Sequence, residues 1–393
     1  MLLRVRLCRG DVRRGFASPF AEEVDLGLGP SSGLWPKVRG LAAEIENLSE
    51  AIPQQSVHKH RTRVGVRLRV ALPLLLGVLV VAIAVGLLVG YQPIDFTSLQ
   101  NDPLARAVFL RLRLPRVLMA GLVGASLAIV GAALQALFRN PLADPFTLGV
   151  SGGASFGASI AIALGIGISI AGIPLIFIVS FIGALVSVFL VYWLASSTGK
   201  VILPGALLLA GVVLNLCASA GVLVIQYLAP YGRSLQILRW LIGSLDVVGF
   251  DLIWKMLILL VPGWLVLMAH ARDLHLLATG EESAASLGVD VRRTERIVFL
   301  ASSVIIGVTV SVGGAIGFVG LIVPHAARLL FGQDVRLLLP VSFLLGAAFL
   351  VLTDTLARVA ISPSELPVGA ITALLGGPVF LILLRKQQRY SAL

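Results

Sequence analysis

The sequence predicts an all-α polytopic membrane protein with ten transmembrane helices, and three observations lead to this fold class. Of the 393 residues, 58% are hydrophobic and only 13% are charged, whereas about 25% of the residues of a soluble domain carry charge. The mean hydropathy is +0.98, and the apolar residues gather into runs of about 20, the length that crosses a bilayer. These runs are rich in Gly, Ala and Ser, which let helices pack closely in lipid.

Ten apolar stretches follow one another along the chain. They are residues 69–90, 115–138, 146–167, 173–195, 202–229, 249–270, 294–313, 315–331, 336–358 and 367–384. The eighth is short and contains Pro324, which removes one backbone hydrogen bond, so we expect it to be bent or partly re-entrant. Residues 1–66 are polar without an apolar period, so we expect a largely disordered cytoplasmic tail before a membrane domain at 67–390.

The basic residues indicate how the helices are oriented. The net charge is +11, and most Lys and Arg residues flank the apolar runs, a pattern that orients spans and does not indicate nucleic-acid binding. If both termini are cytoplasmic, most of these charges lie inside, as expected for a multi-pass protein of the cell membrane. The outer side still receives Arg358 and the arginines at 106, 111, 113 and 116, which indicates that this face uses positive charge.

A pattern of glycines and prolines recurs after 183 residues. Its members are Gly124, Gly131, Pro141 and Gly149 in the first copy and Gly307, Gly314, Pro324 and Gly332 in the second. Five predicted spans separate the copies, so the second would cross the membrane in the opposite sense. The pattern therefore predicts an inverted repeat of the kind that builds a substrate path between two halves, although chance is an alternative because the chain has 41 glycines.

No catalytic or metal-binding set emerges. The only histidines with ligand-like spacing are His58 and His60 in the tail, and Cys8 and Cys217 form neither a disulfide framework nor a metal motif. The chain also lacks a phosphate-binding loop, so any ATP would have to be hydrolysed by another polypeptide. We therefore expect a transport subunit without cofactor or metal. Few carboxylates lie within the runs, which argues against a proton- or sodium-driven carrier.

Polar residues inside the apolar runs are candidates for a wet path, because each costs free energy in hydrocarbon unless it has a partner. They are Gln135, Asn140, Asp144, Asn215, Gln226, Asp354 and Glu365. Asn140, Asp144 and Glu365 fall at run ends and are read as cap or turn residues. Gln135, Asn215 and Gln226 are assigned to a translocation path, with hydrogen bonding between helices as an equal alternative.

The polar link at 271–293 falls on the predicted cytoplasmic face. Thr279 and Glu282 have the spacing of a capping box, and Gly288 can close a helix as its C′ residue. We therefore expect one short helix at about 280–287, with Ala284, Ala285 and Leu287 available to contact a cytoplasmic partner. An ordinary interfacial helix is the alternative.

Several long motifs resemble one known family. They are RLPR (Arg113 to Arg116), GASLAIVGAALQALFRNPLADPFTLGVSGGA (Gly124 to Ala154), LLLAGVVLN (Leu207 to Asn215), GEESAASLGVD (Gly280 to Asp290), GAIGFVGLIVPHAARLLFG (Gly314 to Gly332) and SELPVGAITALLGGPVFLILL (Ser364 to Leu384). In this order they closely resemble the FecCD family, the membrane permeases of ABC importers for ferric siderophores, haem and cobalamin.

The resemblance implies a ten-helix permease that pairs with a second copy or a paralogue, two cytoplasmic ABC ATPase subunits and an extracytoplasmic substrate-binding protein. It implies docking of the binding protein on Arg113, Arg116 and Arg358. It also implies that a coupling helix near 280–288 contacts the ATPase, with the residues Thr279, Gly280, Glu281, Glu282, Ala285 and Gly288. An iron(III)-siderophore is the expected cargo, cobalamin or haem is the alternative, and a nucleotide-independent carrier or channel is a remote one.

Overall fold

The computed structural model describes the backbone of residues 55–90, 101–196, 204–361 and 364–391. The chain separates into two units, Met1–Gly65 and Val66–Leu393, and the second contains the apolar helices. Of the predicted tail, residues 1–54 lie outside the described residues. From Gln55 onward the chain is helical, so the helix that carries the first span begins before the expected boundary at 67.

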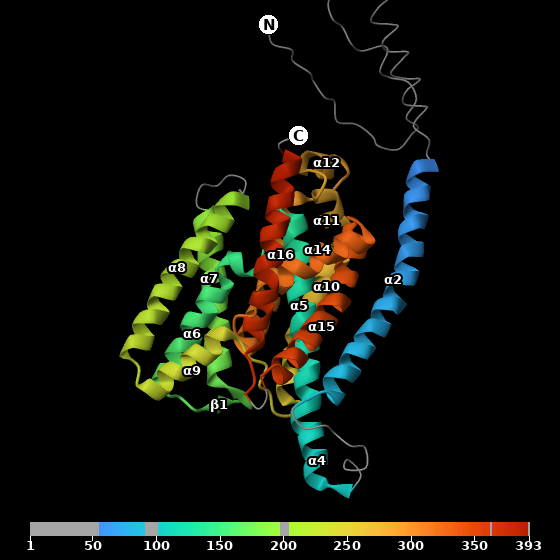
Figure 1. Ribbon diagram of the computed structural model, residues 1–393. Coiled ribbons are helices and arrows are strands. Elements are labelled where there is room, and N and C mark those ends of the chain that lie inside the picture. Colours follow the sequence, from blue (N-terminus) through green and yellow to red (C-terminus); the bar gives the residue numbers. More distant parts are fainter. Residues whose placement is uncertain (1–54, 91–100, 197–203, 362–363, 392–393) are drawn as a thin grey trace, which may run out of the picture. The chain divides into compact units, whose positions relative to one another are not determined.

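The described chain is almost entirely helical, apart from one small antiparallel hairpin (Figure 1). In chain order the elements are α2 (Gln55–Leu88), α4 (Pro103–Val108), η1 (Phe109–Arg113), α5 (Leu114–Leu137), η2 (Pro145–Leu148), α6 (Val150–Leu164), β1 (Ser169–Ile170), β2 (Ile173–Pro174), α7 (Leu175–Ser196), α8 (Pro204–Leu228), α9 (Tyr231–Ile242), α10 (Asp251–Ala269), α11 (Ala271–Leu277), α12 (Glu281–Ser286), α13 (Val291–Gly313), α14 (Val319–Phe331), α15 (Val335–Val359) and α16 (Val368–Ser391).

Ten apolar helices fall on the ten predicted stretches, but they differ in length. Within the described residues, seven are long and apolar enough to cross a membrane. The apolar parts of α6, α14 and α16 are shorter. The helix α14 has 13 residues and spans only about 20 Å, less than the hydrocarbon core of a bilayer. The polytopic helical fold is therefore confirmed, whereas full spanning length is reached by seven helices in the described part of the chain.

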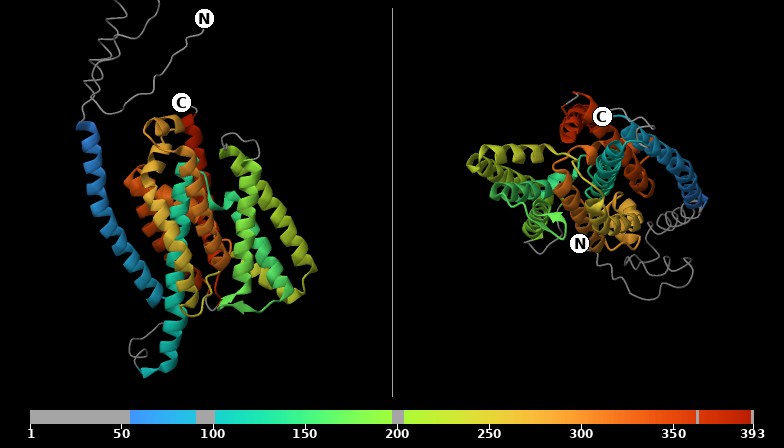
Figure 2. Two further views of the ribbon diagram at one scale, coloured as in Figure 1. Left: turned by 180° about the vertical axis from the view of Figure 1, so that it is seen from behind. Right: turned by 90° about the horizontal axis from the view of Figure 1, so that it is seen from below.

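The helices pack as two groups that meet at α13 (Figure 2). One group consists of α6, α7, α8 and α9. The other is built around α5, which packs against α10, α13, α14 and α15 and is far more buried than most of the other spanning helices. The helix α5 is thus the central element of its group.

Close packing of α5 depends on two glycines. A Cβ atom at Gly124 would overlap the carbonyl oxygen of Gly346 in α15, and one at Gly131 would overlap that of Gly320 in α14. Backbones can approach this closely only where both residues are small. The glycine-rich composition noted in the sequence is therefore used at contacts between helices.

Helix lengths recur in the two halves. A long helix, a short helix and two long helices follow one another as α5 to α8 and again as α13 to α16, with α9 to α12 between them. The short helices α6 and α14 each begin after a residue with left-handed backbone, Gly149 with φ 80° and Phe318 with φ 68°. The start of α5 and the end of α13 lie at the same end of the bundle, as an inverted repeat requires.

The register that the sequence predicted for this repeat is wrong. The 183-residue offset pairs Gly149, which precedes the short helix α6, with Gly332, which follows the short helix α14. It also pairs Gly131 inside α5 with Gly314 at the end of α13. Differences in loop length shift the equivalent positions, so glycine spacing alone does not align the halves.

Gly131→Ala should destabilise the bundle by about 1 to 3 kcal/mol, because its methyl group would meet the backbone of Gly320 and force α5 and α14 apart. Thermal unfolding in detergent measures this effect. Gly77→Ala in α2 is the matched control, since a Cβ there meets no atom within 4 Å. Equal unfolding temperatures for the two variants would contradict the close packing of α5.

Candidate functional site

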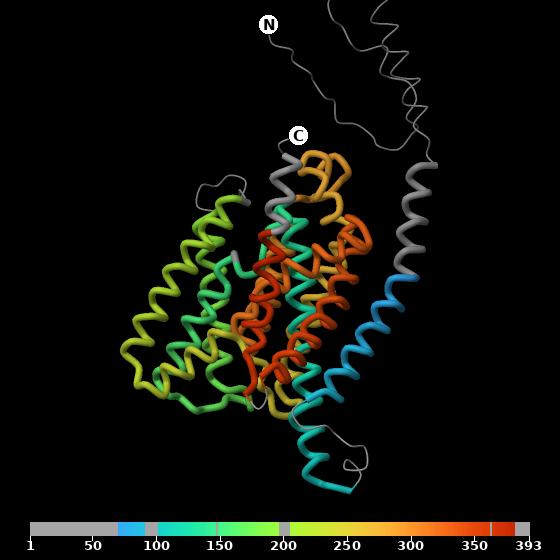
Figure 3. The backbone as a smooth tube through the Cα atoms, viewed as in Figure 1, coloured from blue at the N-terminus to red at the C-terminus, as the bar shows by residue number. Residues whose placement is uncertain are grey.

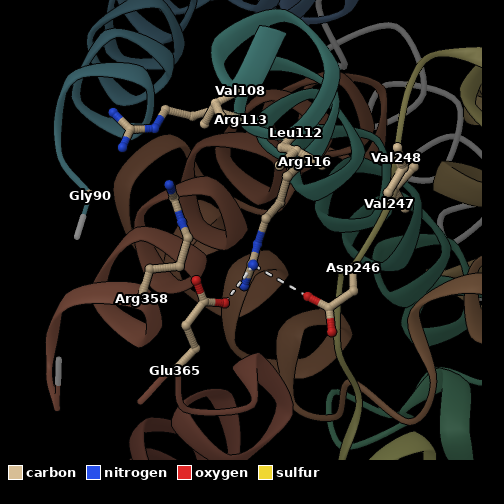
Figure 4. A pocket seen from close by; sticks show the side chains of 10 residues that line it. All are labelled: Gly90, Val108, Leu112, Arg113, Arg116, Asp246, Val247, Val248, Arg358 and Glu365. Carbon is tan, nitrogen blue, oxygen red and sulfur yellow. Dashed lines mark hydrogen bonds and ion pairs between the residues drawn. The ribbon is translucent and has the colours of Figure 1, made fainter. Parts of the chain in front are cut away.

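A cavity of about 310 Å³ opens at the end of the bundle where α2 and α15 end and α5 begins (Figure 4). It is lined by all three arginines that the sequence assigned to docking, together with two carboxylates. We define the arginine cluster as Arg113, Arg116 and Arg358 with the carboxylates Asp246, Asp354 and Glu365. The fold thus brings residues from four distant segments to one end of the bundle.

Arg116 is held by three carboxylates. Its Nε lies 3.1 Å from Asp354 Oδ1, and its Nη1 lies 2.6 Å from Glu365 Oε2 and 3.3 Å from Asp246 Oδ1. The side chain of Asp354 is 1% exposed, whereas those of Glu365 and Asp246 are 47% and 71% exposed. Exposed ion pairs contribute little because water screens them, so Asp354 is the partner that fixes Arg116.

Arg358 is used inside the protein. Its Nε lies 3.0 Å from Asp354 Oδ2, and its Nη2 donates to the carbonyl oxygen of Gly86 at 3.0 Å and to the hydroxyl of Thr355 at 3.1 Å. The side chain is 6% exposed. In this conformation Arg358 therefore ties α15 to α2, and its guanidinium is not presented on the surface. Its docking role, inferred from the resemblance, stays a prediction.

Arg113 lines the cavity from the other side. Its Nη1 donates to the carbonyl oxygen of Leu87 at 3.0 Å, and its side chain is half-buried. Figure 4 shows its guanidinium turned away from Asp246 and Glu365, which both approach Arg116. Arg113 thus differs from Arg116 and Arg358, which share the buried carboxylate Asp354.

The helix that carries Arg113 and Arg116 begins before α5, because α4, η1 and α5 follow one another without a break. The segment η1 is a π-helix. The carbonyl oxygen of Arg111 in η1 accepts a hydrogen bond of 2.8 Å from the amide of Gly249. This bond holds the link between α9 and α10 against the extension, so that Asp246 reaches Arg116. No sequence pattern had indicated Asp246, because its partner is distant along the chain.

The second candidate region lies at the opposite end of α5. Here the short helix predicted at about 280–287 is confirmed as α12, which covers Glu281–Ser286, and a further short helix, α11, precedes it in the same link. Ala284 is fully buried, whereas Glu282, Ala285 and Leu287 are exposed. The exposed face of α12 therefore offers one carboxylate and a leucine, and Ala284 faces the protein instead of a partner.

The two ends of α12 differ in how well the sequence predicted them. The capping box is wrong: Gly280 is the N-cap, no side chain caps the helix, and the Thr279 hydroxyl donates to the carbonyl oxygen of Leu276. The C-terminal prediction is confirmed. Gly288 has φ 86°, its amide donates to Ala285, and the next amide donates to Ala284, which together form a Schellman motif.

A charged residue ties α11 to the beginning of α15. Asp334 caps α15, accepts hydrogen bonds from the backbone and side chain of Arg336, and lies 3.8 Å from His275 of α11. Burial alone would raise the pKa of Asp334, but the Arg336 side chain and nearby His275 lower it below its ordinary value. This carboxylate therefore stays charged at neutral pH and lies beside α11, the helix that precedes α12.

Two of the three path residues bond between helices. Gln135 is buried and donates to the carbonyl oxygen of Gly320 at 3.2 Å. Asn215 of α8 donates to the carbonyl oxygen of Phe146 at 2.8 Å and accepts from the amide of Gly152 at 2.9 Å. These contacts favour the alternative of interhelical hydrogen bonding. Gln226 is half-buried near the end of α8, and its assignment to a path stays a prediction.

Comparison with known proteins decides the family. The model of the FecCD transport family matches residues 75–386, which is nearly the whole second unit. The chain belongs to the FecCD transport family. Members of this family are membrane permeases of ABC importers, so the chain is a transport subunit and not an enzyme.

Over the aligned regions, characterised and uncharacterised permeases are 39 to 46% identical in sequence to this chain. The cobalamin import permease BtuC of Halobacterium salinarum is 46% identical over 72% of this chain and 75% of its own length. The hemin transport permease HmuU of Yersinia pestis is 39% identical over 79% and 94%, and the uncharacterised permease YvrB of Bacillus subtilis is 42% identical over 74% and 82%.

The fold is also similar to a solved structure, an inward-facing conformation of a metal-chelate type ABC transporter. The TM-score is 0.71 at 32% identity, and the match covers 81% of this chain and 99% of that one. The agreement extends over nearly the whole neighbouring chain, as expected for members of one family.

Asp354→Asn should destabilise the permease by about 3 to 5 kcal/mol, because two buried guanidinium groups would lose their shared negative charge. Asp246→Asn is the matched control and should cost less than about 1 kcal/mol, since its carboxylate is largely exposed. Thermal unfolding in detergent distinguishes the two. Equal effects would show that Asp354 does not organise the arginine cluster.

Proposed function

We propose that this permease imports a metal chelate across the cell membrane, with the arginine cluster outside and α12 in the cytoplasm. The observation that carries the proposal is that the arginine cluster and the exposed face of α12 occupy opposite ends of one buried helix, α5. Figure 3 shows the backbone of α5 running between these two ends of the bundle. The distribution of flanking basic residues supports this orientation, with both termini in the cytoplasm.

An extracytoplasmic substrate-binding protein is the partner proposed for the arginine cluster. Arg113 and Arg116 both line the cavity at this end, so a carboxylate on that protein would meet their two guanidinium groups. A competing carboxylate could replace the exposed Glu365 and Asp246 at Arg116, and the loss of these two ion pairs would cost little free energy. Arg358 then acts by holding Asp354, which in turn holds Arg116.

Two cytoplasmic ABC ATPase subunits are the partners proposed for α12. The residues that we assign to this contact, or to the conformation of α12, are Thr279, Gly280, Glu281, Glu282, Ala285 and Gly288. A second permease copy or a paralogue completes the path. Nucleotide binding closes the ATPase pair, α12 moves with it, and the bundle exposes the path alternately to either side. The cargo then crosses a path without strong ligands, to which we assign Gln226.

Bulky metal complexes are the cargo class that we propose. Related permeases are named for cobalamin and hemin, and the similar structure for a metal chelate. An iron(III)-siderophore is our first candidate within this class, with cobalamin and haem as alternatives. Parallel uptake assays with a ferric siderophore, cobalamin and hemin, in cells that produce the complete importer, separate the three.

Arg113→Glu should lower uptake by about tenfold or more, because it would repel the carboxylate of a docking partner. The measurement is uptake into proteoliposomes that contain the permease, its ATPase and its binding protein. Arg106→Glu is the matched control, since Arg106 is exposed at the same end but outside the cluster. Unchanged uptake in the Arg113 variant would refute docking there, and flux without nucleotide would favour a carrier or channel.

Ala285→Trp, alone or with a bulky residue at Glu282, should uncouple ATP hydrolysis from transport. Both side chains are on the exposed face of α12, so enlargement would prevent this face from fitting a partner without disturbing the bundle. The ratio of ATP hydrolysed to cargo transported in proteoliposomes measures the effect. Ala107→Trp, at an exposed alanine of α4, is the control. Normal coupling in the Ala285 variant would count against α12 as the ATPase contact.

A further inference from the structure

The end of α5 has a backbone conformation that favours glycine but carries an arginine. The helix closes with a Schellman motif, in which the amide of Arg139 donates to Ala136 at 3.3 Å and that of Asn140 donates to Gln135 at 3.1 Å. Arg139 is the C′ residue and has φ 50°. A left-handed conformation is strained for a residue with a Cβ, and glycine adopts it without cost. Helix termination therefore does not explain the arginine.

The side chain of Arg139 makes an ion pair with Glu281, the first residue of α12. Both side chains are about one-third exposed, and Glu295 of α13 lies within electrostatic range of the pair. An ion pair of this exposure adds little to stability and has to offset the backbone strain. Stability alone therefore gives no reason for an arginine at this position, which points to a functional one.

The position of the pair connects two regions of the molecule. The helix α12 packs against α11 and α13, and Glu281 reaches from it to Arg139, just after the end of α5. From there α5 runs through the bundle, in close backbone contact with α14 and α15, to Arg116 at its other end. Because packed helices move as rigid elements, a displacement of α12 that pulls on Arg139 would move α5.

We propose that Arg139 is a positioning residue that ties the coupling helix α12 to α5 through Glu281. The inference rests on the proposed function of α12 as the contact for an ATPase. Through this pair, the movement of α12 reaches the helix that carries Arg113 and Arg116. Arg139 acts on transport through α5 and does not contact the cargo.

Three substitutions at Arg139 separate coupling from folding. Arg139→Gly relieves the backbone strain and removes the charge, Arg139→Gln keeps the strain and removes the charge, and Arg139→Lys keeps both. The complete importer in proteoliposomes reports the ATP hydrolysed per cargo molecule, and thermal unfolding of the permease reports stability. Glu281→Gln removes the same ion pair from the side of α12.

We expect Arg139→Gly to unfold at the same or a higher temperature than the wild type. Its ratio of ATP hydrolysed to cargo transported should nevertheless rise about fivefold or more. Arg139→Gln and Glu281→Gln should uncouple to a similar extent, whereas Arg139→Lys should stay close to the wild type.

Wild-type coupling in Arg139→Gly or Arg139→Gln would overturn the role of Arg139, and a large loss of stability in Arg139→Gly would show that the arginine is structural. The proposed function fails in a different way. A wild-type complex that transports without nucleotide, or an Ala285→Trp variant that stays coupled, would refute α12 as the ATPase contact whatever the Arg139 variants do.

Discussion

Close packing of α5 is the constraint on which the rest of the structure depends. Between helices in lipid there is no hydrophobic driving force, so association depends on backbones that approach closely enough for dispersion contacts. Gly131 lies against Gly320 and Gly124 against Gly346, with no room for a Cβ at either contact. The axis of α5 is thereby fixed relative to α14 and α15, and the groups at both of its ends are placed with it.

Charge burial then divides the arginine cluster into two kinds of residue. Asp354 lies between Arg116 and Arg358, and taking these charges out of water is tolerable only because each guanidinium is paired with this carboxylate. The exposed Glu365 and Asp246 supply further negative charge on the other side of Arg116. The guanidinium of Arg358 is occupied by Asp354 and by its hydrogen bond to the carbonyl oxygen of Gly86. In the proposed docking, an approaching carboxylate would displace the water-exposed partners of Arg116. A single buried carboxylate thus makes a rigid base for the proposed docking surface.

The opposite end of α5 follows a different physical rule, because it combines helix termination with electrostatics. Two Schellman motifs close the helices that meet there, with Gly288 at the end of α12 and Arg139 at the end of α5. Glycine satisfies the backbone at the first, whereas the arginine at the second accepts strain and gains contact with Glu281. The helix α5 therefore connects the proposed docking surface at one end with the proposed ATPase contact at the other.

The sequence by itself determined the membrane class, the order of ten apolar helices, the family and the end of α12 at Gly288, because hydropathy, motif order and the conformational freedom of glycine are read from neighbouring residues. Only the tertiary structure decided that Arg358 is buried on Asp354, that Gln135 and Asn215 bond between helices, and that Arg139 meets Glu281. It also replaced the capping box at Thr279 and the register of the repeat. These features depend on which distant segments pack together and how much water they exclude, and local patterns along the chain do not contain that information.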